Sequence, residues 1–150
     1  MSEQLWNPKE QFTLHPQLSM DTALLGYLPL CQVLLMNNMM FPWVILVPQL
    51  PDLKEIMDIV PEKRAILMEE IALVSAMMQH VYAPDKINMA ALGNMVSQLH
   101  IHVIARYKTD HAWPNPVWGN GNKAYTPMAL QEATDILQRE FSKIAGFEKI

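Results

Sequence analysis

The strongest constraint on the fold is a pair of short apolar runs separated by a few turn-forming residues. The runs are Cys31–Met36 and residues 43–47, and the link between them contains Asn37 and Asn38. Apolar runs of this length, bounded by turn residues, are typical of buried strands, and Asn tolerates the positive φ of tight turns. Strands joined by so short a link pair antiparallel, so the sequence predicts a β-hairpin here.

The clearest helical pattern begins at Pro61, a residue favoured in the first helical position, and ends before Pro84. Apolar residues recur within it at three- and four-residue steps: Ile66, Leu67, Ile71, Val74, Met77, Met78 and Val81. Thr126 caps a second predicted helix that runs to about residue 144, with Leu130, Ile136, Leu137 and Phe141 facing inward. A shorter helix is predicted over residues 52–59, with Asp52 as its N-cap.

Four further segments are predicted to be strands: residues 12–14, 24–28, 86–92 and 98–107. Strands and helices do not alternate regularly, and neighbouring strands are joined by short turns. These features predict an α+β fold with an antiparallel sheet of about five strands, one long helix and a C-terminal helix. A chain of 150 residues is expected to form a single domain over residues 1–150.

Composition excludes several classes of function. The net charge of −4 argues against a broad nucleic-acid surface, and no stretch approaches the roughly 20 uninterrupted apolar residues of a membrane span. The start of the chain lacks a secretory signal pattern, and Cys31, the one cysteine, predicts a reducing cytoplasm. Because 51% of this short chain is hydrophobic, we expect a homodimer that covers part of the apolar surface.

Two histidines at alternate positions are the strongest chemical signal. In a strand, Gln98, His100 and His102 share one face, while the apolar residues between them share the other. Three interpretations fit this spacing: a half-solvated strand, a metal site and a catalytic surface. A neutral imidazole is a nucleophile or base with a pKa near cellular pH. A metal site needs a further ligand, which the sequence does not place nearby, so we expect neither metal nor cofactor.

The residues just before the histidines suit an anion. Gly93 allows close backbone approach, and Asn94 and Ser97 can hold phosphate oxygens without positive charge. An ordinary hairpin turn is the alternative interpretation of the same segment.

With these residues in view, the stretch GNMVSQLHIHVIAR resembles the signature of the histidine triad (HIT) superfamily, with Gln98 in place of the first histidine. Upstream, LLMNNMMFPWVILVP resembles the nucleotide-binding hairpin of that family. The resemblance spans about residues 31–106, followed by a C-terminal loop and helix over residues 108–145. The pattern QxHxH is similar to that of a bacterial branch of small HIT proteins.

This resemblance implies a HIT-like fold and a reaction at a nucleotide α-phosphate. His100 would attack the phosphorus to form a nucleotidyl-histidine intermediate, and His102 would hydrogen-bond the phosphate or ribose. Asn94 and Ser97 would lie at the phosphate, Asn37 or Asn38 would hold the ribose, and Leu35 and Phe41 would flank the base. The implied enzyme is a nucleotide hydrolase or transferase whose substrate is a dinucleoside polyphosphate or a nucleoside phosphoramidate.

Departures from the family pattern keep a second function open. Gln98 cannot titrate, and Val44 stands where many members have a further histidine. A nucleotide-binding or sensing module with attenuated catalysis is therefore the alternative. The loop DHAWPNPVWG also has two interpretations, because Trp113 or Trp118 could either pack on the surface or close over the nucleotide.

Overall fold

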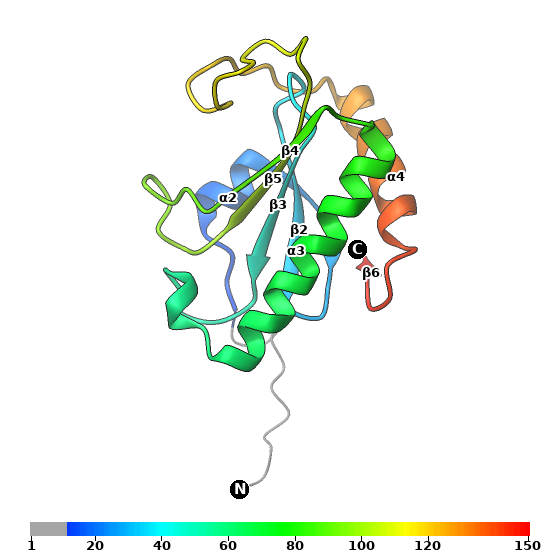
Figure 1. The fold of residues 1–150 in the computed structure, drawn as a ribbon. Helices are drawn as coiled ribbons and strands as arrows, with labels where there is room; N and C mark the ends of the chain where they lie inside the picture. Colours follow the sequence, from blue (N-terminus) through cyan, green and yellow to red (C-terminus); the bar gives the residue numbers. More distant parts are fainter. Residues whose placement is uncertain (1–11) are drawn as a thin grey trace, which may run out of the picture.

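In the computed structural model, which describes residues 12–150, a six-stranded antiparallel sheet forms the centre of the molecule in the order β4-β5-β3-β2-β1-β6 (Figure 1). The strands are β1 (Thr22–Tyr27), β2 (Cys31–Met36), β3 (Trp43–Pro48), β4 (Lys86–Ala90), β5 (Ile101–Arg106) and β6 (Glu148–Lys149). The α+β class is confirmed, with one strand more than the five predicted. The extra strand, β6, has two residues and pairs with β1, so it is too short to show an alternating pattern.

The two long helices cover one face of the sheet. α3 (Pro61–Tyr82) and α4 (Pro127–Phe141) pack on that face, and the short α2 (Pro16–Asp21) lies on the other (Figure 1). The Thr126 hydroxyl accepts a hydrogen bond from Ala129 N at 3.2 Å, which confirms the predicted cap of α4. Within residues 12–150, no helix is both long and apolar enough to cross a membrane.

Alternation along the central strands gives the sheet two separate cores. On β5, Val103 packs beneath the helices, whereas Ile104 packs on the opposite face. On β3, Val44 faces the helices, whereas Trp43 and Ile45 face the other way. The register pairs Ile45 with His102, so the predicted histidine face is the face that carries α2.

The buried face of α3 differs in detail from the predicted set. Leu67, Ile71, Val74 and Met78 are buried, but Ile66 is 44% exposed. Ile136 of α4, also predicted to face inward, is 41% exposed. An apolar stripe on a helix is wider than the part that the sheet covers, so residues at its margin remain in contact with solvent.

Several predicted elements are wrong or shorter than expected. The strand predicted over residues 86–92 ends at Ala90, and the last helix ends at Phe141 instead of near residue 144. Residues 12–15 form no strand, and Pro16 begins α2 instead of a turn. The predicted helix over residues 52–59 reduces to the 3₁₀ turn η1 (Ile56–Asp58), because Asp52 has a φ of +54° and Glu55 is the residue that caps the turn. Strand β5 begins at Ile101, so the link over residues 91–100 contains Gln98 and His100.

Candidate active site

The two predicted histidines lie side by side on one face of the sheet. His102 belongs to β5 and His100 lies just before it, and their ring centroids are 4.7 Å apart. Their exposed fractions are only 5% and 4%. The alternate spacing in the sequence therefore gives two neighbouring, buried imidazoles.

The backbone fixes the orientation of His100. Its Nδ1 lies 2.7 Å from the carbonyl oxygen of Gln98, which can only accept, so Nδ1 carries the proton. The lone pair of a neutral His100 is then on Nε2. Burial lowers the pKa of His100, although the Gln98 carbonyl opposes this effect. His100 is consequently neutral, with a free lone pair, near pH 7.

His102 has the opposite tautomer. Trp43 Nε1 donates to His102 Nδ1 at 3.0 Å, so the proton of a neutral His102 is on Nε2. That nitrogen is buried, and it makes no hydrogen bond of good geometry within residues 12–150. Burial, with a smaller contribution from the charge of His100, lowers the pKa of His102 to about 4, although the Leu92 carbonyl opposes this effect. His102 is therefore a hydrogen-bond donor, not an acid, at neutral pH, and among the described residues the only partner of its Nε2–H is a weak contact with the Leu92 carbonyl.

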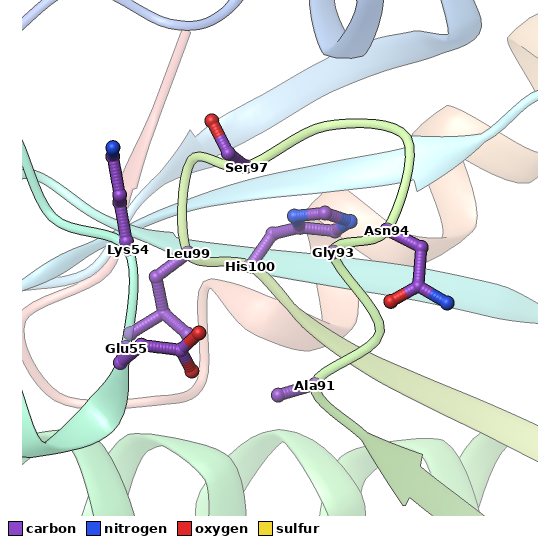
Figure 2. A pocket seen from close by; sticks show the side chains of 8 residues that line it. All are labelled: Lys54, Glu55, Ala91, Gly93, Asn94, Ser97, Leu99 and His100. Carbon is purple, nitrogen blue, oxygen red and sulfur yellow. The ribbon is translucent and has the colours of Figure 1, made fainter.

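His100 opens into a small polar cavity of about 200 Å³. Its lining residues are Lys54, Glu55, Ala91, Gly93, Asn94, Ser97, Leu99 and His100. Figure 2 shows the loop from Gly93 to Ser97 curving around the imidazole of His100, with the Asn94 amide directed away from the ring. A Cβ on Gly93 would lie 2.8 Å from the carbonyl oxygen of Val96, so this tight loop requires glycine.

A second, mainly apolar cavity of about 190 Å³ also reaches both histidines. Its lining includes Met36, Trp43, Ile45, Val96 and Trp118, and Asp21 is its one carboxylate. The ring of Trp118 meets that of His102 edge-on, with centroids 5.0 Å apart. The polar and the apolar cavity therefore meet at His100, as a ligand with a charged group and a flat ring would require.

A buried ion pair holds the loop that carries Trp118. Arg106 Nε donates to Asp110 Oδ2 at 2.8 Å, and Arg106 also donates to Asn88 Oδ1 and to the Asn115 carbonyl, each at 2.8 Å. Burial opposes the charge of Asp110, but hydrogen bonds from Arg106 and two backbone N–H groups lower its pKa to about 2. These bonds join β4, β5 and the loop, and so fix the wall beside His102.

Not all predicted substrate-binding residues gather at this site. Asn94 and Ser97 line the cavity of His100, but Asn37 lies in another cavity, and Asn38 lines neither cavity at the histidines. Asn38 Oδ1 accepts from Met40 N and Lys123 N, and its Nδ2 donates to the Gly121 carbonyl, so its amide anchors the C-terminal loop. Asn37 Oδ1 accepts from Tyr125 N at 2.9 Å.

The side chain of Gln98 does not point at the cavity of His100. Its Oε1 accepts from His15 N at 2.8 Å, and its Nε2 donates to the Thr13 carbonyl at 2.9 Å. Gln98 thus contributes to the site through its backbone carbonyl, while its amide holds residues 13–15.

The hairpin strands refine three other expectations. Val44 faces the helices, so a histidine at that position would point away from His100; the neighbouring Trp43 faces the histidines instead. Leu35 also belongs to the core beneath the helices, which excludes it as a flank for the base in this structure. Phe41 is fully buried on the histidine face.

Several residues at the site were missed by the sequence analysis. Lys54 and Glu55 come from the link after β3, and the helix predicted over residues 52–59 gave no reason to assign them to a site. His15 belongs to no local sequence motif. Trp43 follows Pro42 at the start of a strand, and this position could have indicated which face of the sheet carries the site. Among residues 12–150 no three His, Cys, Asp or Glu side chains are grouped so that they could hold a metal ion.

Comparisons with known proteins agree with this geometry. Residues 17–109 match the family model of the HIT domain. A histidine triad protein from Marinobacter aquaeolei is 43% identical, with a TM-score of 0.86 and coverage of 90% of this chain and 99% of that one. One from Bradyrhizobium japonicum is also 43% identical, with a TM-score of 0.83 and coverage of 87% and 98%. One from Sinorhizobium meliloti is 41% identical, with a TM-score of 0.81 and coverage of 88% and 96%. No curated protein matches the chain.

Proposed function

Because the chain belongs to the HIT domain family, we propose that it is a nucleotide hydrolase or transferase that acts on an α-phosphate through a nucleotidyl-histidine intermediate at His100. One observation carries the proposal: the hydrogen bond between His100 Nδ1 and the Gln98 carbonyl places the lone pair on Nε2. An oriented, neutral imidazole beside a polar cavity is equipped for covalent catalysis.

The first step is attack of His100 Nε2 on the α-phosphorus. The N–P bond forms as the bond to the leaving group breaks, P–O in a dinucleoside polyphosphate or P–N in a phosphoramidate. The leaving group departs with the electron pair and takes a proton from solvent. The imidazole becomes positively charged, and the Gln98 carbonyl that accepts from Nδ1 stabilises that charge.

The second step regenerates the enzyme. Water, or another acceptor in a transferase, attacks the phosphorus as it loses a proton to solvent. The N–P bond breaks, and Nε2 recovers its lone pair. During both steps the Nε2–H of His102 would donate to a phosphate oxygen, because it makes no hydrogen bond of good geometry within the described residues. Asn94 and Ser97, which line the cavity of His100, would hold the remaining oxygens once the Asn94 amide turns toward the ring.

The base would occupy the apolar cavity between Trp43 and Trp118, which is continuous with His100. Asn37 and Asn38 remain candidates for the ribose, although both amides are engaged with the C-terminal loop. Asp21 is better placed, because it lines the apolar cavity together with the histidines.

A nucleotide-binding or sensing module is the second candidate. The observation that favours it is the engagement of the Gln98 amide with residues 13–15, which leaves this residue no part in proton transfer. Such a module would bind nucleotides in the same cavities without forming the intermediate.

His100→Ala separates the two candidates. The protein is incubated with dinucleoside polyphosphates and nucleoside phosphoramidates of each base, and mass spectrometry detects product and nucleotidyl adduct. We expect adduct and turnover in the wild type and in His80→Ala, an exposed position on α3, and neither in His100→Ala. Turnover by His100→Ala at the wild-type rate would refute the enzyme proposal, and binding without adduct in the wild type would establish the module.

We also propose a cytoplasmic homodimer. β4 is an edge strand of the sheet, and Met89 on it is 50% exposed, so a second copy would cover this edge. Light scattering coupled to size-exclusion chromatography measures the mass directly, and a value equal to the 17.2 kDa of one chain at micromolar concentration would contradict dimerisation.

A further inference from the structure

The side-chain amide of Gln98 holds residues 13–15 in place through two hydrogen bonds. Its amide accepts from His15 N at 2.8 Å and donates to the Thr13 carbonyl at 2.9 Å. These are the two kinds of bond that a neighbouring β-strand would make with the same backbone. Both polar atoms of the amide are therefore used to hold residues 13–15 beside the segment that bears the histidines.

These two hydrogen bonds bring a third imidazole, that of His15, to the site. His15 Nδ1 accepts from Gln17 N at 3.0 Å and caps α2, so the proton of a neutral His15 is on Nε2. His15 is thus built as a hydrogen-bond donor. It is also close to His100, because the same Gln98 whose amide holds residues 13–15 lies against His100 Nδ1 through its backbone carbonyl.

His15 lines its own polar cavity of about 420 Å³. This cavity shares Lys54 and Ser97 with the cavity of His100, which in turn shares Asn94 and His100 itself with the apolar cavity. Three spaces therefore adjoin in a fixed order: the apolar cavity, the cavity of His100 and the cavity of His15. With a base in the first and the α-phosphorus at His100, the leaving group would extend toward His15.

We propose that His15 and Lys54 bind a phosphate of the leaving group, and that Gln98 is the positioning residue that keeps His15 there. This inference rests on the proposed function for the placement of the α-phosphate. The residues that line this cavity and could donate to a phosphate are His15, Lys54, Thr13 and Ser97. Asp52 is the one carboxylate in its lining, and its charge limits the cavity to few negative charges, which favours one phosphate over a long chain.

A binding experiment tests the subsite without chemistry. Calorimetry compares the four common ribonucleoside monophosphates with their diphosphates. The test variant is His15→Asn, which keeps a side-chain acceptor for the cap of α2, and His80→Asn is the matched control. A hydrogen bond to a charged group changes affinity by about 10-fold or more. We expect His15→Asn to weaken diphosphate binding by that factor and to leave monophosphate binding unchanged.

Gln98→Met tests whether the Gln98 amide positions His15, because methionine keeps the length of the side chain and removes both hydrogen bonds. We expect the same selective loss of diphosphate affinity, with no further loss in the double variant. In single-turnover experiments, both variants should slow adduct formation at His100 and leave adduct hydrolysis unchanged, since the leaving group has gone by then. A merely structural role would slow both steps.

The outcomes separate this inference from the proposed function. A selective effect of His15→Asn on diphosphate binding, in a protein that forms no adduct, would support the subsite and refute the chemistry. Adduct formation that is insensitive to His15→Asn, together with equal binding losses or none, would refute the subsite and leave the chemistry standing.

Discussion

Burial of His102 should make the protein less stable in mild acid by a predictable amount. The pKa of this histidine falls from 6.5 in the unfolded chain to about 4 in the folded state. Between these values the unfolded chain binds a proton that the folded chain does not, so stability is fully present above pH 6.5 and falls as the pH drops toward 4. Between pH 6.5 and pH 5 the pH falls by about 1.5 units, which corresponds to a loss of about 2 kcal/mol in the free energy of unfolding at 1.36 kcal/mol per unit.

The measurement is urea denaturation of the wild type and of His102→Gln at pH 7 and pH 5. Glutamine does not titrate, and its carbonyl can still accept from Trp43 Nε1. The wild type should lose about 2 kcal/mol more than His102→Gln between the two pH values. The intrinsic contribution of His100 is present in both proteins and cancels in the difference, whereas its smaller electrostatic effect on His102 is part of the quantity measured. His80→Gln, at an exposed position, measures the effect of removing a surface imidazole. If the wild type and His102→Gln lost equal free energy, the low pKa of His102 would be refuted.

Three substitutions test other parts of the structure. Asp110→Asn leaves the buried charge of Arg106 without its partner and should cost about 3–5 kcal/mol in chemical denaturation, whereas a cost below about 1 kcal/mol would show that the pair is solvated. Trp118→Ala removes one wall of the apolar cavity and should weaken nucleotide binding by about 1–3 kcal/mol in calorimetry; unchanged affinity would exclude this cavity as the base site. Glu70→Leu removes the acceptor of two buried backbone N–H groups at the start of β2 and should destabilise by about 2–5 kcal/mol, and an unchanged urea midpoint would contradict that role.

The sequence predicted those parts of the fold whose signals are local. The hairpin of β2 and β3, the helix from Pro61 and the cap at Thr126 each depend on neighbouring residues, and all are found in the structure. The common face of His100 and His102 is equally local, because it follows from alternation alone.

Polar residues with distant partners could not be predicted in the same way. The bonds of Gln98 with residues 13–15 span 83 and 85 positions, and those of Asn38 with the C-terminal loop span similar separations. Glu70, on the buried face of α3, accepts from Cys31 N 39 positions earlier. No pattern around these residues indicates the partner, so the sequence did not predict that Asn37 and Asn38 anchor the C-terminal loop.

The alternation of β3 and β5 gives natural selection two nearly independent sets of positions. Residues such as Val44 and Val103 face the helices, so changes there alter how well the chain folds. Residues such as Trp43 and Ile45 line the cavity, so changes there alter what the chain accepts. New specificity can therefore evolve on one side of a strand while the core beneath the helices is unchanged. Trp43 and Ile45 also belong to the second core, so apolar replacements of similar size are the changes there that fold best.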